Sequence, residues 1–389
     1  MNKYWMCKKI GEVIAPKSDI RKAGNCFSND EIIEYIDISS INNKTNRIEA
    51  TTAISFKDAP SRAQQKVSNG DILVSLVRPN LKNVAIIDSD KKNLVASSGF
   101  AVLRATDINT KYLFRYICSP RFTNYLSGLT TGANYPAVRE LDIKSAIIPI
   151  PAPEEQQRIV DELDLLNGIL EKKKEQIKTL DKLIESIFYE MFGDPVSNEK
   201  GWPINLFGSI CNSELGKMLD AKRAKGTNKP YLCTINVLWD KIDLSTVKEM
   251  PFEDGELERY SIKKGDLLIC EGGDTGRAAI WDRDETVYYQ NSIHRVRLDE
   301  EKMLPQVVLY IMKIYKQQGI LNSFSSGQTI KHLVKKSLLS IPVPTPPIDK
   351  QRVFAQKLDK IKSSQQLIEQ SICDTQQLLA SRMDKYFSE

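Results

Sequence analysis

Few residues of this 389-residue chain combine the types and spacing that catalysis requires. Its two histidines, His294 and His332, lie outside any HExxH pattern and outside any triad-like arrangement. The stretch GGDTGR at 272–277 lacks the Gly-Lys-Ser/Thr ending of a phosphate-binding loop and predicts a tight turn between strands. TPPI at 345–348 has neither the polar residue nor the aromatic side chain that would hold a flipped adenine, so it indicates prolines at a helix start. These patterns predict no catalytic residue and favour a reader or a scaffold.

Seven cysteines are spread along the chain without a CxxC pair or another metal-binding spacing. They are Cys7, Cys26, Cys118, Cys211, Cys233, Cys270 and Cys373. We expect reduced thiols that pack as small apolar side chains, and we expect no metal. The start, MNKYWMCKKIGEV, lacks the apolar core of a signal peptide, and no apolar run is long enough to cross a membrane. The predicted location is therefore the cytoplasm.

The charge of the chain is unevenly distributed. The formal net charge is +5, yet the stretch 153–192 holds 10 acidic and 6 basic residues, and 348–389 holds 6 acidic and 7 basic ones. The remainder therefore carries +8, as a nucleic-acid binder would require, although ordinary surface variation is an alternative reading.

The chain repeats itself after about 195 residues. The matching landmarks are Trp5 with Trp202, Gly11 with Gly208, NGDILVS at 69–75 with KGDLLIC at 264–270, IPIP at 148–151 with IPVP at 341–344, Gln157-Arg158 with Gln351-Arg352, and Phe192 with Phe387. Each unit has a strand-rich front, a helical stretch (near 110–127 and 303–322), a glycine-containing loop, a proline-ended strand and a long helix. The predicted boundaries are 1–152 and 193–347 for two similar domains, and 153–192 and 348–389 for two long helices.

The two long helices carry the strongest periodic signal. In the first, apolar residues recur at alternating spacings of four and three, interrupted by Lys173. They are Ile159, Leu163, Leu166, Leu170, Ile177, Leu180, Ile184, Ile187 and Met191. In the second, Phe354, Leu358, Ile361, Ile368, Ile372, Leu379 and Tyr386 keep a similar phase, interrupted by Gln365, Thr375 and Arg382. Helices this long favour pairing with each other, and we expect an antiparallel coiled coil.

The repeated phrase resembles a known family. TGANYPAVRELDIKSAIIPIPAPEEQQRIVDEL at 131–163 and SGQTIKHLVKKSLLSIPVPTPPIDKQRVFAQKL at 326–358 are similar to the hallmark of type I restriction–modification specificity subunits. The likeness covers the whole chain, with Asp349-Lys350-Gln351 departing from the commoner Glu-Gln pair. It implies an α+β protein with two similar α/β target recognition domains, separated by two long helices that form an antiparallel coiled coil with pseudo-two-fold symmetry.

The resemblance also implies a function. Such a subunit is not catalytic; it reads a bipartite double-stranded DNA site, with one half-site per domain. It docks two adenine-N6 methyltransferase subunits and, through them, the restriction and motor subunits. The methyl donor S-adenosylmethionine would bind to the methyltransferase partners, so no cofactor is expected on this chain, and the target adenine would be flipped into a partner's pocket.

Base readout uses Asn, Gln, Arg, Lys, Ser and Thr side chains on exposed loops, and phosphate contacts use Lys and Arg. The candidates in the first domain are Arg78, Asn80, Lys82, Asn83, Asn134, Tyr135 and Arg139. Those in the second are Lys217, Lys222, Arg223, Thr275, Arg277, Gln290, Asn291, Gln328, Thr329, Lys331 and Lys335. Gly70-Asp71 and Gly265-Asp266 are interpreted instead as turn formers.

Two alternatives remain open at this stage. One is a duplicated coiled-coil scaffold that joins proteins and has no DNA role. The other is a nuclease or methyltransferase that acts alone. DNA binding that weakens steeply with salt would distinguish a reader from a scaffold, because phosphate contacts release counterions.

Overall fold

The computed structural model describes residues 5–130, 136–218, 225–327 and 331–387. The contacts divide the chain into two units, one formed by Met1–Lys174 with Glu369–Glu389 and the other by Glu175–Ile368. Both long helices cross this division, so each unit holds part of each helix. The predicted domain boundaries at the helix ends therefore stay a prediction.

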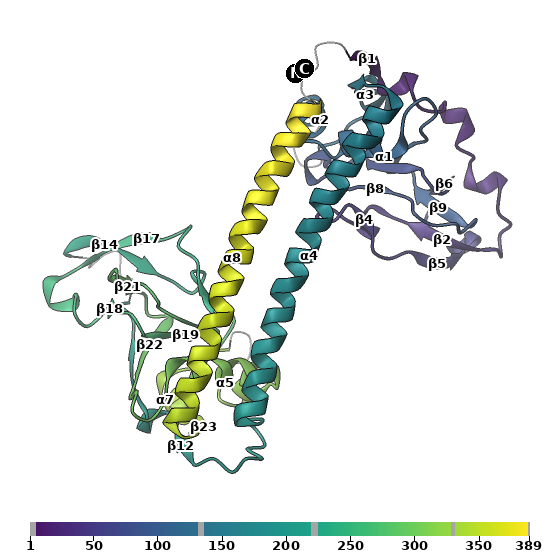
Figure 1. Cartoon of the computed structure of the whole chain (residues 1–389). Helices are drawn as coiled ribbons and strands as arrows, with labels where there is room; N and C mark the ends of the chain where they lie inside the picture. Colours follow the sequence, from purple (N-terminus) through teal and green to yellow (C-terminus); the bar gives the residue numbers. More distant parts are fainter. Residues whose placement is uncertain (1–4, 131–135, 219–224, 328–330, 388–389) are drawn as a thin grey trace. The chain divides into compact units, whose positions relative to one another are not determined.

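Within the described residues, the first unit combines two main sheets and two two-stranded sheets with three short helices, several of which are labelled in Figure 1. Its strands are β1 (Met6–Lys9), β2 (Ile32–Ile36), β3 (Ile41–Asn42), β4 (Arg47–Ile48), β5 (Thr52–Ser55), β6 (Ala63–Lys66), β7 (Ile72–Ser75), β8 (Val84–Ile86), β9 (Leu94–Ser97), β10 (Phe100–Leu103) and β11 (Ile147–Ile150). Its short helices are α1 (Thr110–Ile117), α2 (Pro120–Leu129) and α3 (Glu140–Ser145). The main sheets have the orders β10-β7-β8 and β5-β2-β9-β6.

The second unit repeats this arrangement. Its strands are β12 (Ile204–Leu206), β13 (Cys211–Leu215), β14 (Thr227–Leu232), β15 (Val237–Leu238), β16 (Lys241–Ile242), β17 (Lys248–Phe252), β18 (Ser261–Ile262), β19 (Leu267–Cys270), β20 (Ala278–Ile280), β21 (Val287–Tyr289), β22 (Ile293–Leu298) and β23 (Pro342–Pro344). Its short helices are α5 (Pro305–Gln317), α6 (Ile320–Ser323) and α7 (Lys335–Leu339). The sheet orders β13-β22-β19-β20 and β17-β14-β21-β18 match those of the first unit, apart from the added strand β13.

The central strand of each unit is buried on both faces, which explains its unbroken apolar sequence. In β7, Ile72 and Val74 pack toward the helices while Leu73 packs between the two sheets. In β19, Leu267 and Ile269 pack against helix α5, and Leu268 packs against the other sheet. A strand between two apolar layers cannot alternate apolar and polar residues, because both of its faces are removed from water. The matched layers and strand orders confirm the predicted internal duplication and α+β class.

Backbone hydrogen bonds correct the predicted register of the repeat. Ile10 N–H donates to the Ala146 carbonyl at 2.9 Å, and Phe207 N–H donates to the Ile341 carbonyl at 2.9 Å. Ile10 and Phe207 directly precede the matched glycines Gly11 and Gly208, so the carbonyl groups that they bind are equivalent. Ala146 and Ile341 are separated by 195 residues, rather than by the 193 obtained by matching IPIP to IPVP. The same offset makes Gln156 the counterpart of Gln351, so the pairing of Gln157 with Gln351 was wrong.

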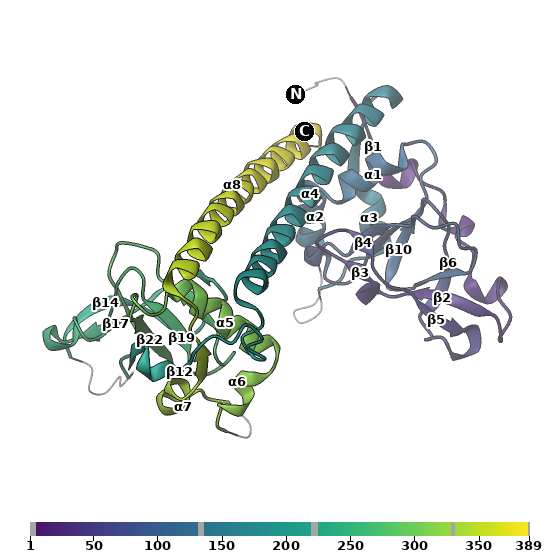
Figure 2. The ribbon, with the colours of Figure 1, turned by 60° about the horizontal axis from the view of Figure 1, so that its bottom comes forward.

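Two helices of 40 residues, α4 (Pro153–Phe192) and α8 (Ile348–Phe387), complete the fold. Within the first unit, Ile159 and Leu163 of α4 pack in the same cluster as Tyr386 and Phe387 of α8. Within the second unit, Ile184, Phe188 and Phe192 pack with Phe354 and Leu358. The start of one helix thus meets the end of the other in each unit, which is an antiparallel pairing (Figures 1 and 2). Each pairing is continuous with the core of its unit.

The predicted seam residues lie on the inner sides of these helices. Ile159, Leu163, Leu166, Leu170, Ile184, Phe354, Leu358 and Tyr386 are buried, whereas Ile177, Leu180, Ile187, Met191, Ile361, Ile368, Ile372 and Leu379 are half-buried. The interrupting Thr375 is also buried, and Lys173 is half-buried. Phe188 and Phe192, which stack edge-on against Phe354, extend the seam beyond the predicted residues.

Candidate nucleic-acid interface

A strained turn carries the first group of candidate DNA contacts. Arg78 and Lys82 adopt left-handed backbone conformations, with φ of 50° and 54°, on either side of the short helix Pro79–Leu81. Arg78 N–H donates to the Pro136 carbonyl at 2.7 Å, so the turn lies against the segment that follows residue 135. The side chains of Arg78 and Asn80 are exposed, and those of Lys82 and Asn83 are half-buried. Non-glycine residues in this conformation are uncommon and concentrate at functional sites.

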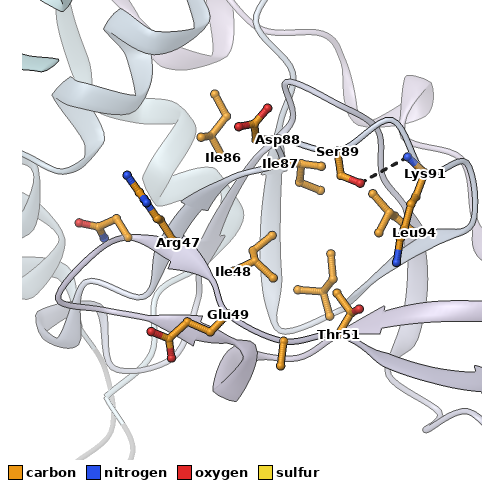
Figure 3. Close-up of a pocket in the computed structure, with 13 residues that line it drawn as sticks. Arg47, Ile48, Glu49, Thr51, Ile86, Ile87, Asp88, Ser89, Lys91 and Leu94 are labelled. Atoms are coloured by element: carbon orange, nitrogen blue, oxygen red, sulfur yellow. Dashed lines mark hydrogen bonds between the residues drawn. The ribbon is translucent and has the colours of Figure 1, made fainter. Parts of the chain in front are cut away.

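A side chain from a distant hairpin holds this turn in place. Asn46, in the turn between β3 and β4, donates its amide to the Lys82 carbonyl at 3.0 Å and to the Val84 carbonyl at 3.1 Å. Asn46 also lines a pocket of about 580 Å³ between the hairpin and β8. Figure 3 shows residues of both charge signs around this pocket, among them Arg47, Glu49 and Asp88. Mixed charge does not favour phosphate, and we therefore interpret this region as support for the turn.

The remaining candidates of the first unit are less informative. The Arg139 side chain is 79% exposed and pairs with Asp142 at 2.9 Å, an arrangement that lowers the pKa of the Asp142 carboxyl through the hydrogen bond from Arg139. Arg139 also caps the N-terminus of helix α3 and follows Val138, whose N–H donates to the Leu76 carbonyl at 2.9 Å. It is therefore close to the Arg78 turn. Asn134 and Tyr135 lie outside the described residues.

The second unit has a turn at the equivalent place. Leu333 N–H donates to the Glu271 carbonyl at 2.8 Å, which repeats the Val138–Leu76 contact 195 residues later. The turn 271–277 is nevertheless built differently. The Thr275 side chain is 5% exposed and donates to the Lys331 carbonyl, and the Arg277 guanidinium donates to the Thr234 carbonyl at 2.6 Å. Both predicted contacts thus have structural partners within the unit.

Other candidates of the second unit surround this turn. Asn291 N–H donates to the Lys217 carbonyl at 2.9 Å, and Gln290 forms a bridge with Lys217. The Lys217 side chain is 15% exposed, and its ammonium forms an ion pair with Glu256 and donates to the Pro251 carbonyl at 2.8 Å. Its charge is therefore compensated internally. Lys331 and Lys335 are exposed, and Lys335 approaches Glu214 at 3.4 Å.

Four predicted contacts of the second unit cannot be placed. Lys222, Arg223, Gln328 and Thr329 lie outside the described residues.

A basic pocket beside the Arg78 turn was missed from the sequence. Lys17, Arg21 and Lys22 line a pocket of about 800 Å³, together with polar side chains such as Gln64 and with Leu76 at the root of the turn. Lys17 forms an ion pair with Glu140, whereas Arg21 and Lys22 make none within the described part of the chain. Cations without a carboxylate partner are available for phosphate. Spacing could not reveal this pocket, because its residues come from 17–26, 64–76 and 98–100, and also include Glu140.

The structure offers little for other chemistry. Among the described residues, no group of His, Cys, Asp and Glu could hold a metal ion, and no helix is both long and apolar enough to cross a membrane. Burial raises the pKa of the Cys118 and Cys211 thiols to about 12 and that of Cys270 to about 11, which keeps these three sulfurs protonated and unreactive.

Comparison with known proteins identifies the class. A family model described as "Type I restriction modification DNA specificity domain" matches residues 2–179 and again 199–374. Two matches in one chain agree with the two units of like topology. The chain belongs to the family of type I restriction–modification specificity subunits, which are non-catalytic and carry DNA recognition domains.

Individual relatives are distant. The chain is 29% identical over 142 residues to the MjaIX specificity subunit of Methanocaldococcus jannaschii, which covers 32% of this chain and 33% of the relative. It is 28% identical over 174 residues to the HindI specificity subunit of Haemophilus influenzae, covering 44% and 37%. The chain thus spans about a third of the length of these two relatives. The EcoKI specificity subunit of Escherichia coli is 21% identical over 395 residues, covering 93% of this chain and 84% of the relative.

Two solved structures share the fold. One, from work titled "Structural basis underlying complex assembly and conformational transition of the type I R-M system", aligns with a TM-score of 0.67, 22% identity and coverage of 99% and 98% of the two chains. The S subunit of a type I restriction–modification system from M. genitalium aligns with a TM-score of 0.55, 15% identity and coverage of 100% and 97%.

Proposed function

We propose that this chain reads a bipartite double-stranded DNA site, with one half-site per unit, inside a multisubunit adenine-N6 methyltransferase. The observation that carries the proposal is the contrast between the two equivalent turns. At the offset of 195, the exposed Asn80 corresponds to the buried Thr275, and the half-buried Lys82 corresponds to Arg277, which donates to a backbone carbonyl. Equivalent positions with different chemistry are suited to reading two different base sequences.

The long helices would supply the assembly function. We propose that α4 and α8 dock two methyltransferase subunits and, through them, the restriction and motor subunits. Repeated helices suit this role because two identical partners require two equivalent surfaces. S-adenosylmethionine would bind to the methyltransferase subunits, where the flipped adenine would also react. The complex would act in the cytoplasm, where its DNA lies.

Methylation mapping tests this proposal directly. N6-methyladenine would be mapped across the genome of the host with the gene intact and with the gene deleted. We expect one set of methylated sites to disappear on deletion, and we expect those sites to share two short sequences separated by an unread gap of constant length. A single contiguous motif would contradict the two-reader function, and an unchanged map would favour the scaffold alternative.

Binding measurements with the assembled complex give a second test. Affinity for DNA that contains the mapped site should fall steeply as salt rises, because each phosphate contact releases counterions. The isolated chain with S-adenosylmethionine and DNA should show no methyl transfer and no cleavage. Methyl transfer by the isolated chain would overturn the assignment of chemistry to partners.

A further inference from the structure

Polar contacts interrupt the apolar seam between α4 and α8 at three places. The Lys173 ammonium donates to the Thr375 hydroxyl at 3.0 Å and to the Ser371 carbonyl at 3.1 Å. Glu162 forms an ion pair with Arg382 at 3.0 Å and accepts a hydrogen bond from the Tyr386 hydroxyl. Both of these contacts join residues of the first unit.

The third contact lies in the second unit. There the Gln365 amide donates to the Asp181 carboxylate at 2.8 Å. Thr375 is only 9% exposed and Glu162 is 28% exposed, so the first two contacts are partly shielded from water, whereas Asp181 is exposed. In each case α4 contributes the charged group and α8 contributes a group that satisfies it.

The repeat shows what α4 would meet if it paired with itself. A step of 195 residues takes Arg382 to Ile187, Thr375 to Leu180 and Gln365 to Leu170. An antiparallel pair of two α4 helices in the same register would therefore place Glu162, Lys173 and Asp181 opposite apolar residues. A polar group that is buried without a partner costs about 1–3 kcal/mol, and more when it is charged. Pairing of α4 with α8 avoids that cost at Glu162 and Lys173, the two places that are partly shielded from water.

Charge acts in the same direction. Around Lys173, the α4 segment 171–182 carries five lysines and three acidic residues, whereas the α8 segment opposite it, 369–380, carries Glu369 and Asp374 and no basic residue. Two copies of α4 would therefore bring two segments of net positive charge together, and like charges repel. An antiparallel pair of two α8 helices would also bring like charges together. The residue of α8 equivalent to Glu162 is Lys357, which would face Arg382.

We propose that these polar contacts select pairing of α4 with α8 of the same chain and exclude pairing with the α4 helix of a second copy. The helix that pairs with α4 is therefore α8 of the same chain. Each subunit then contains both of the non-identical recognition units. A buried polar position that specifies the partner of a helix, at a cost in stability, is an established use of such residues in coiled coils. The inference rests on the helix contacts and does not depend on what the readers bind.

Self-association of the full-length chain tests the proposal. The variant Glu162→Leu/Lys173→Leu/Asp181→Leu makes the α4 seam apolar, and Asp161→Leu/Glu171→Leu/Lys172→Leu makes the same three kinds of change at exposed positions of α4. Sedimentation should give a dimer dissociation constant at least about tenfold lower for the seam variant than for the control. Amine cross-linking between isotopically distinct copies should then join α4 to α4. Equal self-association of the two variants, or wild-type dimers joined through α4, would overturn the proposal.

A second measurement covers the case in which the seam variant aggregates. Urea denaturation would compare the wild type, Lys173→Met, Thr375→Val and the double variant. We expect the double variant to lose less than the sum of the single losses, because the Lys173–Thr375 contact is then removed from both sides. Additive losses would show that this contact has no selective value and would also overturn the proposal.

Discussion

Gln351 repeats, 195 residues later, the hydrogen bonds of Gln156. The Gln156 carbonyl oxygen accepts from Asn109 N–H at 2.9 Å, and its amide donates to the Pro151 carbonyl at 2.8 Å. The Gln351 carbonyl oxygen accepts from Leu304 N–H at 2.8 Å, and its amide donates to the Pro346 carbonyl at 2.8 Å. Both side chains are buried, with exposed fractions of 4% and 0%. Gln156 therefore connects the start of α4 to the start of α1, and Gln351 connects the start of α8 to the start of α5.

Replacing this glutamine should destabilise the unit that contains it. Gln351→Leu removes the partners of Leu304 N–H and the Pro346 carbonyl, both of which stay near the core. We expect the free energy of unfolding to fall by about 2–3 kcal/mol. Gln366→Leu, at an exposed position of the same helix, should change it by less than about 0.5 kcal/mol. Chemical denaturation measures both, and equal values for the two variants would contradict this role of Gln351.

A buried aspartate is also repeated in both units. Asp71 pairs with Arg104 at 2.8 Å, and Asp266 pairs with Arg297 at 2.7 Å; the two carboxylates are 1% and 3% exposed. The hydrogen bonds that the two guanidinium groups donate to these carboxylates raise the pKa of both arginines. Asp266 also accepts from Lys263 N–H at 2.7 Å and thus closes the turn that the sequence predicts at Gly265. These aspartates are structural rather than DNA contacts.

Asp266→Ala should therefore cost stability, about 2 kcal/mol, because it leaves Arg297 and a turn N–H without their partner. The matched control is Asp284→Ala, whose carboxylate is 88% exposed in its pair with Lys264 and should contribute less than about 1 kcal/mol. The two unfolding free energies can be compared in the same buffer. A loss at Asp284 as large as that at Asp266 would refute the interpretation.

The repeat and the two long helices are predictable from the sequence because both are local or periodic signals. A seam such as Ile159, Leu163 and Leu166 follows from helix geometry alone. The offset of the Ile-Pro phrase is not predictable, since prolines recur at every second residue and two alignments fit equally well. Only the hydrogen bonds of Ala146 and Ile341 decide between them.

The candidate interface is less predictable, for a physical reason. The sequence does not show whether a polar side chain on a turn faces solvent or forms a hydrogen bond with the backbone. The side chains of Thr275 and Lys217 donate to backbone carbonyl groups. Strand pairing between distant segments decides this, and local sequence does not encode it. The same limitation hid Arg21 and Lys22, which only the fold brings beside the Arg78 turn.

The buried His294 should make the second unit sensitive to acid. Its Nε2–H donates to the Leu333 carbonyl at 2.8 Å, while Nδ1 has no partner in the described structure. Burial lowers the pKa of this imidazole below 6.5, the ordinary value. The unfolded chain then binds more protons than the folded one, so this contribution to stability is present above pH 6.5 and is lost as pH falls toward the folded pKa.

Urea denaturation at several pH values measures this effect. The free energy of unfolding should fall below pH 6.5 with a contribution of up to about 1.4 kcal/mol per pH unit from this residue. His294→Gln retains a donor for Leu333 and removes the titration, so its curve should be flatter. His332→Gln, at an exposed position, serves as the control and should keep the wild-type slope. An unchanged slope in the His294 variant would refute the assignment.

The basic pocket should contribute to DNA affinity without reading sequence. Arg21→Ala/Lys22→Ala removes two cations, so the slope of log affinity against log salt for the assembled complex should become less steep by about 2. Specific and non-specific DNA should be affected similarly. Lys57→Ala is the control, since Lys57 is exposed but already paired with Asp30 at 2.7 Å. A double variant with the wild-type slope would place the DNA elsewhere on the first unit.

Arg78 should behave differently, because a guanidinium on a rigid, exposed turn is suited to bidentate contact with guanine. We expect Arg78→Ala to relax or abolish preference at one position of a single half-site, at a cost of about 1–3 kcal/mol. The other half-site and the gap should be unchanged, since neither the second unit nor α4 and α8 are altered. Arg78→Lys should restore affinity better than selectivity, because lysine lacks the planar pair of donors. Methylation of a randomised target library by the reconstituted complex measures both, and a change in the other half-site or in the gap would show that the two units do not read independently.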